Sequence, residues 1–221
     1  HPIPHMSSVP APATPTPSPS VPAPSVVGDA AVASADLVAV YTAPHGGLLA
    51  TFVNPQRSGA PLTFLVVDDD GDGWLKVELP QRPNGSTGWV SADSVTLQRL
   101  VYSLRASTRD NTLSLFKDSV LVATYAVATG TGGTPTPHGS FYLTELLQPT
   151  NGGYGPYAFG LSAFSEVLSN FGGGPGQIGL HGTEDAASIG RAASHGCIRM
   201  SNADITALAA LLPLGTPIVI E

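Results

Sequence analysis

Two short segments near the C-terminal end contain the residues best suited to chemistry, namely His181-Gly182 and the run from Ser194 to Arg199. Cys197 is the single cysteine of the chain, and these segments also hold two of the six histidines, His181 and His195. A thiol is mostly protonated near neutral pH, and a nearby imidazole can accept its proton and so produce a nucleophilic thiolate. This combination predicts acyl transfer through a thioester.

Glycines lie beside both candidate groups. Gly196 precedes Cys197, and glycine allows unusual backbone angles and close approach of a substrate. The backbone N–H groups of Gly196 and Cys197 are candidates to face a developing oxyanion. Gly182 follows His181, and its carbonyl is a candidate to orient the imidazole, as a carboxylate does in other triads.

The same residues resemble the signature of L,D-transpeptidases of the YkuD type, which pair an upstream His-Gly with a Ser-His-Gly-Cys core. Upstream, Gly130 and the stretch from Thr136 to Phe141 resemble the Thr-Pro-x-Gly-x-Phe stretch of that family. The resemblance continues downstream through Arg199, Asn202, Asp204 and Leu214 to Pro217, so it extends over nearly all of residues 100–221.

The resemblance implies that Cys197 is the nucleophile and that His181 is its general base. It also implies that the Gly182 carbonyl orients His181. His195 would flank the thiolate, either taking part directly or supporting the site by position. His138, which lies in the upstream stretch, is expected to be an exposed loop residue and not a ligand.

Three further roles follow from the resemblance. Ser194 would hydrogen-bond within the site, or serve only as a turn hydroxyl, and Gly196 would contribute a backbone donor. Relatives have Asn or Arg at the position of Arg199, and a guanidinium suits bidentate binding of a substrate carboxylate. The alternative for Arg199 is a structural ion pair with Asp185 or Asp204.

The implied reaction acts on peptidoglycan stem peptides. Cys197 would attack the carbonyl between the third and fourth residues of a donor tetrapeptide, D-alanine would leave, and the amine of an acceptor stem would resolve the thioester into a 3-3 crosslink. The resemblance also implies acylation by carbapenems. The chemistry requires no cofactor and no metal. Water as acceptor would give an L,D-carboxypeptidase, a protein lysine is a further acceptor, and a non-catalytic module that binds the cell wall is the rival from another class.

Composition excludes one large class of partner. The 221 residues have a formal net charge of -7, only 11% are charged, and the nine basic residues are scattered. Nucleic-acid binding needs clustered Lys and Arg, so no nucleic-acid partner is expected. The acidic run from Asp68 to Gly73 lacks the glutamate that an EF-hand loop needs at its twelfth position, and it predicts a hairpin turn.

The chain divides into three parts by composition. Residues 1–35 are rich in Pro, Ala and Ser and predict an extended or disordered spacer, whose first six residues look like a remnant of an expression tag. Residues 36–98 show short apolar runs between turn signals and resemble a bacterial SH3-like domain, a small β-barrel. Residues 99–221 form the predicted catalytic domain.

The overall prediction is a mostly β protein with one short C-terminal helix. Alternating apolar residues predict strands within residues 100–128, 141–143, 178–180 and 218–220, and residues 149–160 are expected to form a loop or lid. Ser201 or Asn202 is expected to cap a helix that carries Ile205 and Leu208 on its apolar face.

The location follows from the implied substrate. Peptidoglycan lies outside the cytoplasmic membrane, so the protein is expected in the cell envelope or cell wall. No apolar run reaches the length of a membrane span, and none resembles a signal peptide. Attachment to a membrane would therefore require a signal or lipid anchor upstream of His1.

Overall fold

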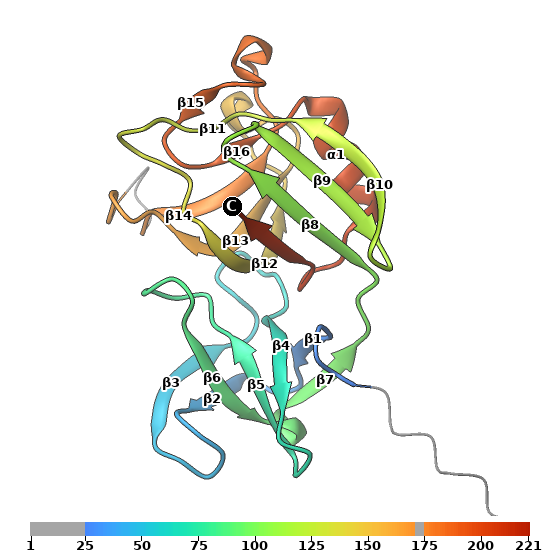
Figure 1. Ribbon diagram of the computed structural model, residues 1–221. Coiled ribbons are helices and arrows are strands. Elements are labelled where there is room, and N and C mark those ends of the chain that lie inside the picture. Colours follow the sequence, from blue (N-terminus) through green and yellow to red (C-terminus); the bar gives the residue numbers. More distant parts are fainter. Residues whose placement is uncertain (1–24, 171–174) are drawn as a thin grey trace, which may run out of the picture.

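The computed structural model describes residues 25–170 and 175–221, and these form two β-sheet regions connected by one extended segment (Figure 1). The prediction of a mostly β fold with one short C-terminal helix is confirmed. The first 24 residues of the predicted spacer, with the tag-like residues at its start, lie outside the described part of the chain.

The first region is an antiparallel seven-stranded sheet with the order β3-β2-β6-β5-β4-β1-β7. Alternate residues of its strands, such as Val38, Val40, Val77 and Val90, are fully buried on one face, because successive side chains of a strand point to opposite faces. An upstream β region is therefore confirmed. Its strands are β1 (Ala30–Ala33), β2 (Leu37–Tyr41), β3 (Leu48–Val53), β4 (Thr63–Asp69), β5 (Trp74–Glu78), β6 (Thr87–Ser91) and β7 (Val95–Gln98).

Strand β1 lies inside the range that composition assigned to the spacer. It pairs with both β4 and β7, and Ala30 and Ala31 are fully buried. The prolines of the spacer end at Pro24, so nothing prevents the following residues from joining a sheet. Small side chains are needed there, since a Cβ placed on Gly215 of the second region would lie 2.7 Å from Ala30 Cβ.

The acidic run from Asp68 to Gly73 covers the end of β4 and the turn to antiparallel strand β5, so the predicted hairpin turn is present. Its carboxylates accept hydrogen bonds from the turn backbone. Asp69 Oδ1 accepts from Gly71 N–H at 2.8 Å, and Asp70 Oδ1 accepts from Trp74 N–H at 3.0 Å. These carboxylates thus stabilise the turn in the way expected of Asx-type side chains.

The second region is a mixed eight-stranded sheet with the order β10-β9-β8-β17-β12-β13-β14-β16, which curls into a half-barrel. Its pairings are antiparallel except β17 with β8 and β14 with β16. Strands β11 (Thr129–Gly130) and β15 (Ala192–Ser194) form a separate parallel pair. The others are β8 (Tyr102–Ser107), β9 (Thr112–Lys117), β10 (Val120–Ala126), β12 (Gly139–Leu147), β13 (Ala158–Phe164), β14 (Gln177–His181), β16 (Ile198–Arg199) and β17 (Pro217–Ile220).

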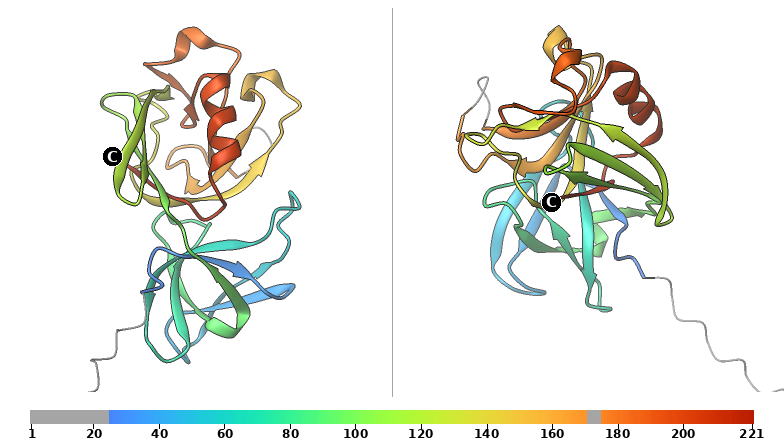
Figure 2. Two further views of the ribbon diagram at one scale, coloured as in Figure 1. Left: turned by 90° about the vertical axis from the view of Figure 1, so that its right-hand side faces the viewer. Right: turned by 45° about the horizontal axis from the view of Figure 1, so that its top comes forward.

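Helix α1 (Asn202–Leu211) lies within the curve of this sheet, as the left view of Figure 2 shows. Ile205 and Leu208 are fully buried in the core that the strands supply. Ser201 is the N-cap, with its Oγ accepting from Asp204 N–H at 3.1 Å, so the predicted helix and its capping residue are confirmed.

The predicted loop at residues 149–160 is wrong at its end, where β13 begins at Ala158. Residues 152–154 form a 3-10 turn, and β13 then pairs with β12 on one side and β14 on the other. The Gly-rich sequence hides this strand from local pattern analysis. Pairing with two neighbours distant in sequence supplies the stabilisation that local propensity lacks.

Candidate active site

The register between parallel strands β14 and β16 brings the two predicted chemical groups together. Leu180 pairs with Ile198, and both are fully buried in the core. Gly179 and His181 flank Leu180 on the strand and therefore lie on its opposite face, as Cys197 and Arg199 do beside Ile198. A cavity of about 310 Å³ is lined by His181, Ser194, His195, Cys197 and Arg199, among other residues.

The thiol and the imidazole both pack against Gly179. A Cβ placed on Gly179 would lie 3.9 Å from Cys197 Sγ and 3.7 Å from His181 Cδ2. Gly179 N–H also donates to Cys197 Sγ at 3.3 Å. Burial raises the pKa of the Cys197 thiol, whereas this hydrogen bond and the positive charge of Arg199 act to lower that pKa.

The imidazole of His181 is buried and held in one orientation. Its Nδ1–H donates to the Gly182 carbonyl oxygen at 2.5 Å, which leaves Nε2 as the nitrogen able to accept a proton. Tyr154 packs its ring edge-on against the imidazole, with 4.9 Å between ring centroids. Burial lowers the pKa of His181 and Arg199 lowers it further, while the bond to Gly182 raises it, so a neutral imidazole is favoured near pH 7.

Close packing around Gly182 fixes the carbonyl that orients His181. A Cβ on Gly155 would lie 2.6 Å from Gly182 Cα. The backbones of Gly155 and Gly182 are therefore in contact, and neither residue has room for a side chain. Asn202, the first residue of α1, accepts from Thr183 N–H at 2.9 Å. The segment after His181 is therefore held between the helix and the loop before β13.

The Ser194 side chain organises the turn that presents Cys197. Its Oγ donates to the Cys197 carbonyl oxygen at 2.5 Å and accepts from Gly196 N–H at 3.1 Å. Gly196 has φ 128°, a conformation that favours glycine. Because Gly196 N–H is engaged by Ser194, the expectation that it faces an oxyanion does not fit this geometry, and the N–H of Cys197 is left as the candidate donor.

The Thr136 hydroxyl, from the Thr-Pro stretch, connects this turn to β11. Its Oγ1 donates to the Gly196 carbonyl at 2.7 Å and accepts from Gly130 N–H at 2.9 Å, and the side chain is buried. Thr136→Val keeps the shape but leaves both backbone groups without this partner. We expect a loss of about 2 kcal/mol in the free energy of unfolding, measured by urea denaturation.

Thr136→Ser is the matched control, because it retains the hydroxyl and loses only a methyl group. Its stability should stay close to that of the wild type. Equal stability of the valine and serine variants would show that the hydroxyl does not hold this turn.

The remaining predicted residues divide between the cavity and its surroundings. Arg199 lines the cavity, and the ion pairs formed within residues 25–170 and 175–221 are Arg105–Glu221 and Arg109–Asp110. A structural pair of Arg199 with Asp185 or Asp204 is thus absent from that part of the chain. His195 is exposed and lines the cavity. His138 is not among the lining residues, and its ring contacts Thr108 Oγ1 at 2.8 Å.

Sequence reasoning missed three residues of the site. Gly179 contacts the thiol. The only feature of the sequence that could have pointed to this residue is its position two residues before His181 on the same strand. Tyr154 lines the cavity and packs its ring against the His181 imidazole. Glu184 lines the cavity from the segment after His181 and carries no sequence signal.

The site has a buried imidazole oriented by a carbonyl, and a thiol lies near the same glycine, Gly179. This arrangement defines the class, a cysteine–histidine site on a mixed β-sheet. The family model for the L,D-transpeptidase catalytic domain, YkuD, matches residues 102–220. The chain therefore belongs to the YkuD family of L,D-transpeptidase catalytic domains.

Two relatives from Bacillus agree with this assignment. The "Putative L,D-transpeptidase YkuD" of Bacillus subtilis is 32% identical over 149 residues, which cover 65% of this chain and 84% of that protein. The protein of the same name from Bacillus licheniformis is 38% identical, with 64% and 83% covered. The crystal structure of L,D-transpeptidase 3 from Mycobacterium tuberculosis in complex with a faropenem-derived adduct is 17% identical, with a TM-score of 0.47 over 61% of this chain and 73% of that one.

Proposed function

We propose that the protein is a peptidoglycan L,D-transpeptidase that forms 3-3 crosslinks through a thioester on Cys197. The observation that carries the proposal is the packing of the Cys197 thiol and the oriented His181 imidazole against Gly179 in one cavity. Membership of the YkuD family supports the same reaction.

In the first half of the reaction, His181 Nε2 takes the thiol proton as Cys197 Sγ attacks the carbonyl that joins the third and fourth residues of a donor stem. The C–N bond of the resulting tetrahedral intermediate then breaks. The proton held by His181 passes to the leaving amine, D-alanine departs, and the donor remains bound as a thioester. The burial that keeps thiol and imidazole neutral at rest suits a base that acts only when substrate arrives.

In the second half, the side-chain amine of an acceptor stem attacks the thioester carbonyl. His181 Nε2 accepts a proton from that amine and returns it to the sulfur as the C–S bond breaks. The product is an amide between two third-position residues, and the thiol is regenerated. We assign the Cys197 N–H as the donor to the oxyanion in both steps.

The supporting roles follow from the contacts in the cavity. Ser194 and Gly196 shape the turn that carries Cys197, and Gly182 orients His181. His195 borders the cavity mouth as a supporting residue. Arg199, which lines the cavity, is proposed to bind a stem carboxylate in bidentate fashion.

The rest of the chain is assigned by the same proposal. Residues 36–98, together with strand β1 before them, act as an SH3-like domain beside the catalytic domain at residues 99–221. The protein works outside the cytoplasm, where peptidoglycan lies. Over the described residues, no helix is both long and apolar enough to cross a membrane. Carbapenems are proposed as covalent inhibitors, because their strained amide can be opened by the Cys197 thiolate.

The test is mass spectrometry of products formed from a disaccharide-tetrapeptide that contains diaminopimelate, with Cys197→Ala as the control. We expect a dimer that has lost one D-alanine, formed by the wild type and absent from the variant. Tripeptide alone would favour the L,D-carboxypeptidase, in which water resolves the thioester. Absence of both products would overturn the proposal and favour another acceptor or a module that only binds the wall.

A further inference from the structure

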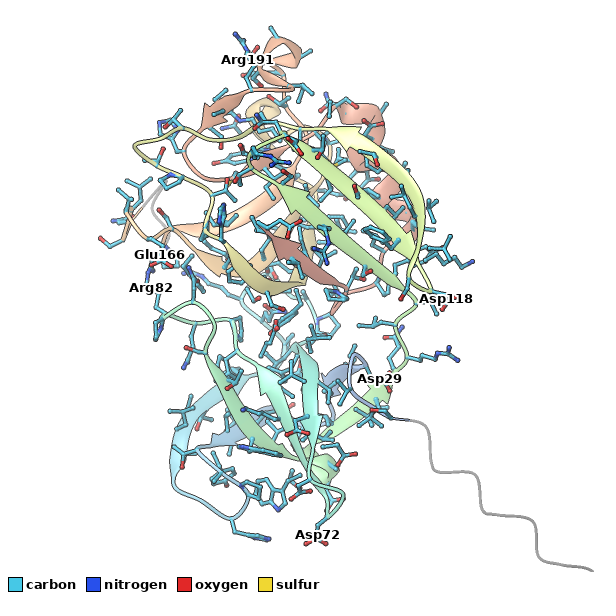
Figure 3. All side chains as sticks on the ribbon, viewed as in Figure 1. Asp29, Asp72, Arg82, Asp118, Glu166 and Arg191 are labelled. Atoms are coloured by element: carbon cyan, nitrogen blue, oxygen red, sulfur yellow. The ribbon has the colours of Figure 1, made fainter. Side chains whose placement is uncertain are left out.

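The hairpin between β5 and β6 of the N-terminal sheet contacts the wall of the active-site cavity. Figure 3 shows Arg82 rising from that hairpin toward Glu166, which lies just after β13 in the catalytic region. Between β13 and β14, the described residues 165–170 and 175–176 form a segment that supplies Ser165, Leu168 and Gly176 to the cavity lining. An element of one sheet thus reaches the substrate cavity of the other.

Arg82 binds backbone carbonyls on both sides of this segment. Its guanidinium donates to Ser165 O at 3.0 Å, to Leu168 O at 2.9 Å and to Pro175 O at 2.6 Å. It also lies over the Phe164 ring, 5.1 Å from its centroid. A planar group with several fixed donors can satisfy three carbonyls at once, whereas a lysine ammonium is a single point with different geometry.

Asn84 holds the start of the same segment by pairing with its backbone. Its side-chain amide donates to Phe164 O at 2.7 Å, and its Oδ1 accepts from Phe164 N–H at 2.9 Å. This two-way exchange imitates the pairing of a neighbouring strand. The amide also donates to Glu166 Oε1 at 2.8 Å.

The segment leaves little room for alternative positions near Gly176. Gly176 has φ 77°, and a Cβ there would run into the Leu168 carbonyl and lie 3.1 Å from Arg82 Nη2. Ser165 N–H donates to Gly176 O at 2.8 Å, which ties the two ends of the segment together. Arg82 therefore links the described residues on the two sides of this wall, Ser165 and Leu168 with Pro175.

From these contacts we propose that Arg82 and Asn84 are positioning residues for substrate binding, and that the N-terminal sheet region completes the donor cavity of the catalytic region. This inference rests on the proposed transpeptidase function. The contacts of the thiol and imidazole with Gly179 and Gly182 all lie within the catalytic region, so Arg82 acts on binding and not on the reactivity of Cys197.

The first measurement is the Kd of the disaccharide-tetrapeptide for the 221-residue Cys197→Ala protein, with and without Arg82→Ala. Arg82→Ala should raise Kd about tenfold, because it removes the charge-assisted hydrogen bonds that order the cavity wall. Arg82→Lys should recover only part of the affinity. Arg57→Ala, which removes an exposed arginine of the N-terminal region that makes none of these contacts, should bind like the parent.

The second measurement separates positioning from damage to the site. With Cys197 present, Arg82→Ala should raise KM for the tetrapeptide about tenfold and leave the rate of Cys197 alkylation by iodoacetamide within about twofold of wild type. Asn84→Ala should behave in the same way, more weakly.

Three results would overturn the inference. An unchanged Kd in Arg82→Ala, with the parent binding normally, would contradict it while leaving the proposed function intact. A parallel fall in alkylation rate would show that the thiol site itself is disturbed. Failure of the parent to bind the tetrapeptide, together with no turnover by wild type, would remove the proposed function and this inference with it.

Discussion

Replacing His181 with glutamine is expected to slow acylation of Cys197 by about 10²–10⁴-fold at pH 7, the usual contribution of a general base. Glutamine fills a similar space but cannot take the thiol proton. Burial raises the pKa of the Cys197 thiol, so few thiolates form at pH 7 without the base. Acylation by a carbapenem, followed by mass spectrometry of the intact protein, measures the rate directly.

The pH dependence distinguishes a lost base from a damaged site. As the pH rises toward the raised pKa of Cys197, the thiol ionises unaided, and the His181→Gln variant should regain activity relative to wild type. Tyr154→Phe serves as a matched control, because it retains the ring that packs against His181. A His181→Gln rate equal to wild type at pH 7 would exclude His181 as the base.

Glu78→Gln is expected to change the pH dependence of stability. Glu78 is buried between the two sheet regions, where its Oε1 accepts from Ser140 Oγ at 2.8 Å. Within the described residues, its Oε2 and the neighbouring buried Tyr142 hydroxyl have no hydrogen-bond partner. Burial raises the pKa of Glu78 to about 7, and the bond from Ser140 offsets this only in part.

The direction in which stability changes with pH follows from where Glu78 binds its proton more tightly. The folded state binds the Glu78 proton more tightly than the unfolded state, whose pKa is near 4.5. The stabilisation is therefore complete below about pH 4.5 and is lost as the pH rises toward 7, a change of about 3 kcal/mol in the free energy of unfolding. Glutamine stays neutral, so the variant should lose this slope and be the more stable protein at pH 8.

Urea unfolding followed by tryptophan fluorescence at pH 5 to 8 measures this effect. Trp74 lies in β5, the strand that carries Glu78, and Trp89 lies in β6, which pairs with β5. Both tryptophans therefore report on unfolding of the sheet that contains Glu78. Glu145→Gln is the matched control, since Glu145 is a half-buried interface carboxylate that accepts from Ser58. Equal pH slopes for wild type and Glu78→Gln would contradict the prediction.

The sequence by itself determined the family and the fold class, and it predicted the chemistry. A single cysteine in a Ser-His-Gly-Cys run, with a His-Gly upstream, indicated the nucleophile and its base, because reactivity depends on residue types that are visible in the chain. Alternating apolar residues indicated the strands, and Ser201 with its downstream apolar spacing indicated the one helix. These signals are local, and local patterns are what a sequence shows directly.

Only the tertiary structure decided how the site is completed. Gly179 lies beside Cys197 because β14 and β16 are paired, and Arg82 reaches the cavity wall because two sheets meet. Strand β1 likewise forms by pairing with β4 and β7, without a strong signal of its own. Such contacts join residues far apart in the chain, and the free energy that fixes them comes from burial and pairing across that separation.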